Sequence, residues 1–173
     1  AGEIFNRSLD DERTLQAISS LVVPALADWC FIDLVDAEGG FERIAAAHAR
    51  PEEEPLARRL LRHYRPGAAT PYSIPDTFRH GQTVMMNDVS SDLLESLARD
   101  EEHLDALRAL GMRCFISVPM TSRGTTFGVL TLAGTATRAR FEAGDAALAE
   151  ELARRGALAV DNARLYTNAQ EAN

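Results

Sequence analysis

Two hairpin patterns constrain the fold of this chain more than any other feature of its sequence. In each pattern, a run rich in aromatic and aliphatic residues is followed by a short glycine-containing turn and a second such run. The patterns occupy residues 29–35, 36–40 and 41–49, and residues 112–120, 122–124 and 125–133. Strands joined by short turns pair antiparallel, so we expect an antiparallel sheet.

Apolar residues at helical spacing occur before, between and after the two hairpins. This spacing predicts an N-terminal helix over about residues 10–27 and a long C-terminal helix over about residues 141–170. Between the hairpins the sequence predicts a helix over 51–64, a loop over 65–75, a short strand over 82–89, and helical structure over 90–110 that is broken near Asp100 and ended by Gly111. Helices segregated from hairpins indicate an α+β fold built in layers.

Length and charge limit the partners that this chain can have. A length of 173 residues suits one domain. The 18 basic and 26 acidic residues give a net charge of -8, which repels nucleic acid and anionic membrane surfaces. The longest apolar run, residues 21–27, is too short to cross a bilayer, and no signal-peptide pattern precedes it. We therefore expect a cytoplasmic domain that binds neither nucleic acid nor, within this segment, a membrane.

The sequence contains none of the common catalytic motifs that we considered. Gly-x-Ser-x-Gly, a Walker loop and His-Glu-x-x-His are missing, and the histidines have no metal-ligand spacing. Cys30 and Cys114 each lie inside an apolar strand-like run, and two lone cysteines do not form a disulfide framework. We therefore expect no catalytic residue and no metal site.

Two parts of the chain resemble the GAF domain family. Residues 118–132 are similar to the last hairpin of GAF domains, in which a proline ends one strand, a turn glycine follows, and a Gly-Val-Leu-like run opens the next strand. Residues 141–145 and 159–166 are similar to the GAF terminal helix. The order of elements agrees with that of GAF domains over nearly the whole chain. The sequence most resembles the GAF domains of bacterial sensor histidine kinases and of sporulation-type serine/threonine phosphatase regulators.

The resemblance implies one GAF domain over residues 1–173, with a core over 28–140, cut from a larger bacterial signalling protein. Its fold would be α+β, GAF-like and related to PAS and profilin-like folds, with five or six antiparallel strands. The terminal helices would cover one face of the sheet, and the middle helices and loops would roof a pocket on the other. GAF domains bind cyclic nucleotides, tetrapyrroles, amino acids or other small effectors, so the resemblance implies a small-molecule-sensing regulatory domain that has no catalytic site of its own.

Strand alternation suggests which side chains face that pocket. Phe31 with Asp33, and Phe115 with Ser117, combine aromatic rings with polar groups, as a ligand site requires. By analogy with the family, the last strand would add Leu130 and Leu132, while Val129 and Thr131 would face away. The cysteines fall on the other face, and the GAF strand order would separate their strands by one more strand. That separation is too long for a disulfide, so we expect free, buried thiols.

The residues do not identify a cofactor. His103 precedes Gly111 at a spacing similar to that of the chromophore-contacting histidine in bilin-binding GAF domains of phytochromes. Asp-Glu-Glu precedes it where a Ser-Pro type context is expected, and no Asp-Ile-Pro type motif or attachment cysteine is found, so a solvated helix-surface histidine fits better than a bilin or haem contact. We keep His103 as a candidate ligand-site residue beside those on the strands. Phe141 and Asp145 match part of the cyclic-nucleotide motif, but Ala146 replaces its Glu and the chain contains no lysine.

Three functions stay open on the sequence alone: small-molecule sensing, which we favour, a ligand-free dimerisation or spacer domain, and a cysteine-based redox enzyme. In the final helix one apolar row is expected to face the sheet, namely Leu148, Leu152, Ala159 and Ala163. This arrangement leaves Leu158, Leu165 and Tyr166 for a partner helix, so we expect a homodimer through the terminal helices.

Overall fold

A five-stranded antiparallel sheet forms the centre of the molecule. The computed structural model describes residues 9–59, 70–136 and 138–172. The strand order is β2-β1-β5-β4-β3, and the strands are β1 (Trp29–Val35), β2 (Phe41–His48), β3 (Val84–Met86), β4 (Cys114–Ser122) and β5 (Thr125–Gly134). The two predicted hairpins are β1–β2 and β4–β5, and antiparallel pairing of β1 with β5 joins them. The predicted antiparallel α+β architecture is confirmed.

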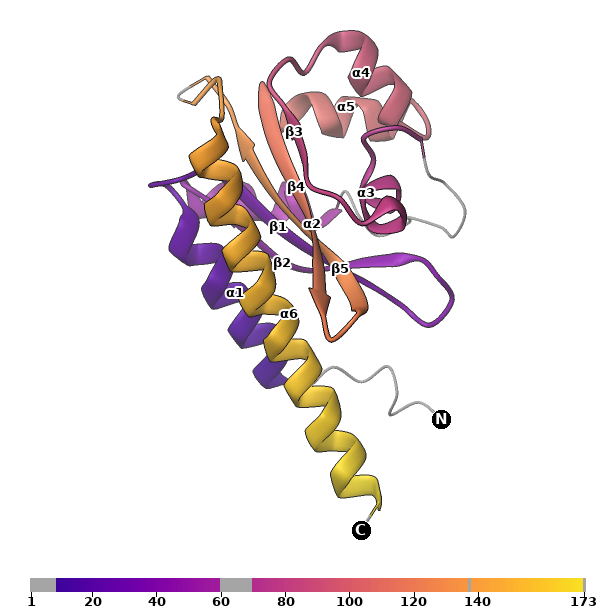
Figure 1. The fold of residues 1–173 in the computed structure, drawn as a ribbon. Coiled ribbons are helices and arrows are strands. Elements are labelled where there is room, and N and C mark those ends of the chain that lie inside the picture. The colour runs from indigo at the N-terminus through magenta and orange to yellow at the C-terminus, as the bar shows by residue number, and fades with distance from the viewer. Residues whose placement is uncertain (1–8, 60–69, 137, 173) are drawn as a thin grey trace.

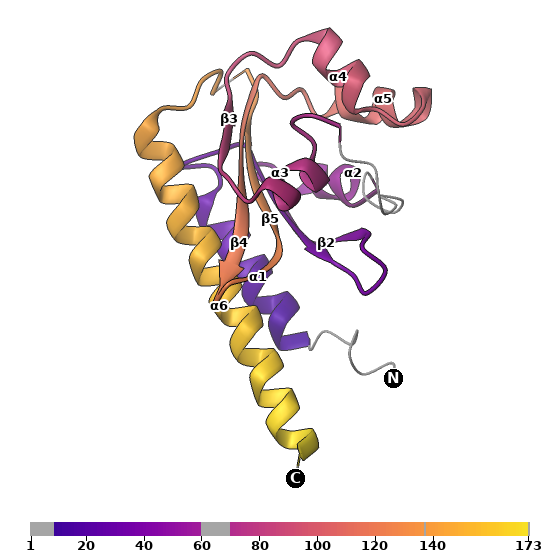
Figure 2. The ribbon, with the colours of Figure 1, turned by 45° about the vertical axis from the view of Figure 1, so that its right-hand side comes forward.

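The helices lie in two layers, one on each face of the sheet. Helices α1 (Leu9–Val22) and α6 (Ala143–Ala172) run side by side along one face (Figures 1 and 2). The other face is covered by α2 (Glu54–Arg59), α3 (Ile74–His80), α4 (Ser91–Leu97) and α5 (Glu101–Ala109), with a 3-10 turn (Pro51–Glu53) before α2. The terminal helices and the middle helices therefore occupy the layers that the resemblance implied.

Helix α3 was not predicted, because the prolines near it favour a loop. Its start is fixed by Ser73, whose side chain accepts a hydrogen bond from the backbone N–H of Asp76, and by Pro75 in the first turn. Gly81, with φ of 71°, ends the helix in the left-handed conformation. The break predicted near Asp100 is present, and the Asp100 side chain caps α5. Part of the helix predicted over 51–64, and of the loop over 65–75, lies outside the described residues.

The sheet buries an aliphatic layer beneath α1 and α6. Cys30 pairs with Leu132 and Ile32 with Leu130, and all four side chains are buried in this layer. Directly opposed residues of antiparallel strands share a face. The prediction that Leu130 and Leu132 face the pocket is therefore wrong, because the family analogy shifted the face assignment of β5 by one residue, which exchanges its two sides.

Helix α6 packs on the sheet mainly through small residues, and of the two leucines predicted to face the sheet only Leu152 packs against the core. The buried positions are Ala149, Ala153, Gly156, Ala157 and Val160, whereas Leu148 is 55% exposed. A Cβ atom on Gly156 would lie 2.7 Å from Cε of Met120, so α6 approaches β4 closely at this point. The assignment of Leu148 to the sheet-facing row is thus wrong, because close packing of the helix selects the alanine and glycine face.

Gly128 explains part of the sequence motif that carries the resemblance. A Cβ atom at this position would lie 2.0 Å from the backbone oxygen of Asp33 and 2.9 Å from Cα of Leu34. Since these are backbone atoms, the close approach of β1 and β5 requires glycine here. The cysteines follow the prediction: Cys30 and Cys114 are free and buried, and β5 lies between their strands.

Candidate functional site

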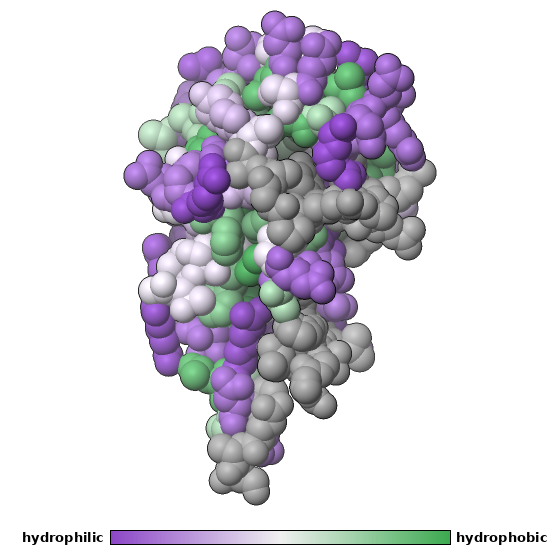
Figure 3. All heavy atoms as spheres, turned by 90° about the vertical axis from the view of Figure 1, so that its right-hand side faces the viewer, coloured by the Kyte–Doolittle hydropathy of each residue, from purple (hydrophilic) through white to green (hydrophobic). Residues whose placement is uncertain are grey.

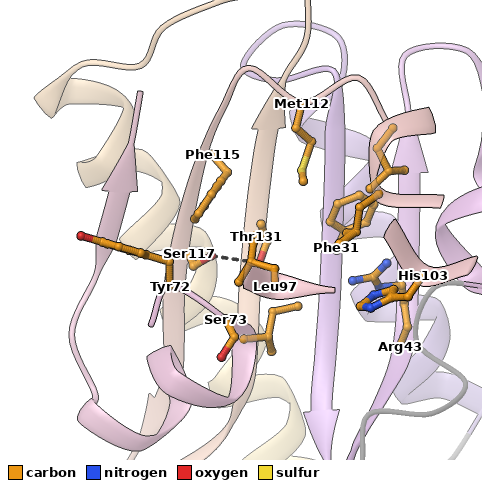
Figure 4. Close-up of a pocket in the computed structure, with 13 residues that line it drawn as sticks. Phe31, Arg43, Tyr72, Ser73, Leu97, His103, Met112, Phe115, Ser117 and Thr131 are labelled. Carbon is orange, nitrogen blue, oxygen red and sulfur yellow. Dashed lines mark hydrogen bonds between the residues drawn. The ribbon is translucent and has the colours of Figure 1, made fainter. Parts of the chain in front are cut away.

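A pocket lies between the sheet and the middle helices (Figure 4). It contains about 550 Å³ of space free of protein atoms, including the part that opens to solvent. Its floor is formed by strand residues Phe31, Arg43, Phe115, Ser117 and Thr131, and the rest of its wall by Tyr72, Ser73, Ile74, Leu97, His103, Leu107, Leu110 and Met112. In Figure 3 the surface at the α4–α5 end of the molecule is mainly hydrophilic, with scattered hydrophobic side chains.

The largest polar group of the floor is Arg43, which is held by a buried ion pair. Its Nε donates to Oδ1 of Asp33 at 2.9 Å and its Nη2 to Oδ2 at 3.3 Å. Nη1 donates to the backbone oxygen of Ala57 at 2.8 Å, and the guanidinium carbon lies 4.1 Å from the centre of the Phe31 ring. Burial raises the pKa of Asp33, and the charge and hydrogen bonds of Arg43 oppose that rise. Every donor and contact named here fixes the guanidinium in place.

This ion pair changes the role predicted for Asp33. The carboxylate is fully buried and is not part of the pocket wall, whereas Arg43 is. Sequence reasoning missed Arg43 altogether. The signal that would have found it is its position directly opposite Asp33 in the first hairpin, where opposite charges favour a cross-strand pair.

His103 lies in the pocket wall close to Arg43 (Figure 4) and is only 5% exposed. Its Nδ1 accepts the backbone N–H of Arg99 at 3.0 Å, and its own backbone N–H donates to the Asp100 side chain at 2.8 Å. Burial and the charge of Arg99 lower the pKa of His103, so the ring is neutral at pH 7. The expectation of a solvated histidine is therefore wrong. Leu107, one turn further along α5, is also buried, and that helical spacing is the signal that was missed.

Hydroxyl groups supply the other polar atoms of the pocket. Oγ of Ser117 and Oγ1 of Thr131 lie 3.3 Å apart and share a buried hydrogen bond between directly paired positions of β4 and β5. Ser73 adds the hydroxyl that caps α3. The prediction that Thr131 faces away from the pocket is wrong, because the face assignment of β5 was shifted by one residue. Thr131 and Leu130 are neighbours on β5 and point to opposite faces, so the shift exchanged their places.

A comparison with protein families matches residues 10–160 to the GAF domain. This chain belongs to the GAF domain family. GAF domains are regulatory domains of signalling proteins. No curated protein sequence matches the chain.

Solved GAF domains share the fold. The GAF domain/HD domain protein from Geobacter sulfurreducens has a TM-score of 0.69 at 20% identity, covering 90% of this chain and 95% of that chain. The GAF domain of a phosphoenolpyruvate-protein phosphotransferase from Coxiella burnetii has a TM-score of 0.69 at 17% identity, covering 96% and 91%. The blue-light absorbing form of the PixJ GAF domain from Thermosynechococcus elongatus has a TM-score of 0.58 at 21% identity, covering 96% and 96%.

The GAF fold brings four of the predicted ligand-site residues together in the pocket wall: Phe31, Phe115, Ser117 and His103. Asp33 lies outside the pocket wall, where it pairs with Arg43 of the wall. Leu130 and Leu132 lie on the opposite face of the sheet, beneath α1 and α6. Within the described ranges, no three His, Cys, Asp or Glu side chains are grouped so that they could hold a metal ion. None of the helices described is both apolar and long enough to pass through a lipid bilayer.

Proposed function

We propose that this GAF domain senses a small organic molecule in its pocket and works inside a larger bacterial signalling protein, such as a sensor histidine kinase or a phosphatase regulator. The observation that carries the proposal is the composition of the pocket wall. Aromatic and aliphatic side chains surround a few oriented polar groups, which is the usual make-up of a small-molecule site. The proposed role is regulatory, and chemistry would belong to another domain of the parent protein.

The proposed signal leaves the pocket through α6. Residues 82–89 connect α3, which forms part of the pocket wall, with α4, and they contact the C-terminal segment at two places, at Phe141 just before α6 and at Glu150 within α6. Asn87 exchanges two hydrogen bonds with the backbone of Phe141, and Thr83 donates to Glu150 at 2.8 Å. A ligand that favours one arrangement of α3 and α4 would therefore bias the position of α6, by no more than its difference in affinity for the two arrangements.

A second candidate function is dimerisation through the terminal helices without a ligand. Leu158 and Leu165 are 46% and 43% exposed and lie seven residues apart on α6, and Tyr166 beside them is 68% exposed. That spacing suits a two-helix contact. Dimerisation is also compatible with ligand sensing, so we propose a homodimer in both cases.

The buried thiols give no support to a cysteine-based redox function. Burial raises the pKa of Cys30 to about 12, so its thiol stays protonated.

A ligand screen with a pocket-filling variant tests the proposal. Thermal-shift measurements and native mass spectrometry with a library of small organic molecules should find binders of the wild-type domain. Leu97→Trp should abolish that binding, because Leu97 lines the pocket and the larger ring would occupy it. Leu93→Trp is the matched control, since Leu93 lies on the same helix but outside the pocket wall, and it should keep binding. A wild-type domain that binds nothing in such a library would contradict ligand sensing and favour the ligand-free dimerisation function.

A further inference from the structure

We infer that the pocket takes an uncharged, mostly apolar ligand with a flat aromatic part, and that it discriminates against carboxylates and phosphates of the same shape. The inference rests on the proposed function and names the chemical class of its ligand. Two observations carry it. The charge of Arg43 is paired with that of Asp33, and hydroxyl groups supply other polar atoms of the pocket wall.

Arg43 is the one side chain with a permanent charge among the described residues of the pocket wall. Its charge is already compensated, because its Nε and Nη2 each meet a different carboxylate oxygen of Asp33. Nη1 is directed to the backbone oxygen of Ala57, and one face of the guanidinium lies over Phe31. An anion entering the pocket would lose its hydration and would lie near the Asp33 carboxylate as well as the guanidinium. The buried pair therefore offers an anion no net attraction.

His103 adds no positive charge to balance an anion. Its Nδ1 accepts the backbone N–H of Arg99, so in the neutral ring the proton lies on Nε2. Arg43 and Arg99 both oppose a second proton on this ring, whereas Asp100 favours it. With Arg43 paired to Asp33 and His103 neutral, the described residues of the pocket wall present no uncompensated positive charge to a ligand.

The remaining polar atoms suit neutral groups. The hydroxyls of Ser73, Ser117 and Thr131 can each donate and accept, which matches an amide, a carbonyl or a hydroxyl on a ligand. Phe31 on β1 and Phe115 on β4 present aromatic rings from the floor (Figure 4), and a flat aromatic ligand can pack against such rings over a large area. The pocket therefore combines apolar surface with neutral hydrogen-bonding groups.

Matched pairs of probes test this inference on the wild-type domain. Indole-3-carboxamide and indole-3-carboxylate have nearly the same shape and differ in charge, and benzamide and benzoate form a second pair. Isothermal titration calorimetry at pH 7.5 should give at least about tenfold tighter binding of the amide in each pair, which corresponds to about 1.4 kcal/mol. Equal or tighter binding of the carboxylates, or no binding of either amide, overturns the inference. The proposed function fails separately, when a broad library yields no ligand of any charge.

A charge variant gives the second arm of the test. Asp33→Asn keeps the shape of the side chain but leaves the Arg43 charge uncompensated, so indole-3-carboxylate should bind at least about tenfold more tightly than to the wild type. Glu38→Gln removes one negative charge from the exposed turn between β1 and β2, at a position outside the described pocket wall, and should leave the preference for amides unchanged. An unchanged carboxylate affinity in folded Asp33→Asn contradicts the inference. If this variant does not fold, the wild-type titrations decide the question alone.

Discussion

Asn87 and Phe141 are joined by two hydrogen bonds between a side-chain amide and a backbone. Nδ2 of Asn87 donates to the oxygen of Phe141 at 2.9 Å, and the N–H of Phe141 donates to Oδ1 of Asn87 at 2.8 Å. The Phe141 side chain is buried in the core beneath α1 and α6. These bonds fix the residue that follows β3 to the segment that leads into α6, so one amide side chain connects the chain between α3 and α4 with the entry to the C-terminal helix.

Replacement of that amide should cost more stability than loss of the neighbouring exposed contact. Asn87→Ala leaves the backbone N–H and oxygen of Phe141 without their partner, and should lower the free energy of unfolding by about 1–3 kcal/mol. Thr83→Ala removes only the exposed bond to Glu150 and should cost less than about 1 kcal/mol. Urea unfolding followed by circular dichroism measures both values. Equal losses in the two variants would contradict the role given to Asn87.

Gly128→Ala should destabilise the sheet. The new Cβ would meet the backbone of Asp33 and Leu34, which cannot move without separating β1 from β5, so the loss should be about 1–3 kcal/mol or more. Gly144→Ala is the control, because no atom lies within 4 Å of its added Cβ at the exposed start of α6. Thermal and urea unfolding should show the control at or above wild-type stability. A Gly128→Ala domain as stable as the control would refute the close approach.

His103 should give the domain a pH-dependent stability. Its pKa is lowered in the folded state, so between that lowered value and 6.5 the unfolded chain binds more protons. The stabilising contribution of the neutral ring is therefore complete above pH 6.5 and is lost as the pH falls below it. Free energies of unfolding at pH 7.5 and 5.5 should differ less in His103→Gln than in the wild type. Identical pH dependence in the two proteins would show that the ring titrates normally.

The two thiols should be inert in the folded domain. Burial raises the pKa of both Cys30 and Cys114, the former to about 12, and neither side chain is exposed. A thiol reagent such as dithionitrobenzoate should therefore react slowly at pH 8, and with both thiols at once after unfolding in urea. Since the folded pKa of Cys30 exceeds the ordinary value of 9.0, its contribution to stability is complete below pH 9 and falls as the pH rises toward 12. Rapid labelling of the folded domain would reopen a redox role.

The exposed leucines of α6 should hold the proposed homodimer together. Leu158→Glu with Leu165→Glu removes two apolar contacts, each worth about 1.5–3 kcal/mol when buried, and should make the domain monomeric at micromolar concentration. Met85→Gln is the control, because Met85 on β3 is as exposed as Leu165, at 43%, but lies at the edge of the sheet. Analytical ultracentrifugation distinguishes the two states. A double variant that stays dimeric would place the interface elsewhere.

Local patterns were enough to predict most elements of this fold. Both hairpins could be found because turn glycines and runs of strand-forming residues lie next to each other in the sequence. Helix α3 was missed because Pro75 at its start is also common in loops, and a helix this short has little periodicity to measure. The exposure of Leu148 on α6 was missed because the closeness of the helix to the sheet depends on Gly156 meeting Met120, a contact between distant parts of the chain.

The pocket was only partly predictable for a related reason. Phe31, Phe115 and Ser117 follow from alternation within one strand, which the sequence shows directly. The face of Leu130 and Thr131 depends on how β5 pairs with β1 and β4, and the role of Asp33 depends on Arg43 across the hairpin. Pairing register joins residues that are far apart in sequence, so the strand pattern alone could not supply these assignments.

The most direct test of the account is a backbone NMR titration of the ¹⁵N-labelled domain with indole-3-carboxamide. Chemical-shift changes that grow with probe concentration are expected at Phe31, Ser117 and Thr131 in the pocket floor and at His103 in its wall. Shifts confined to α1 and α6 would contradict the claim that the pocket between the sheet and the middle helices is the ligand site, and no shifts at all would contradict the inferred class of ligand.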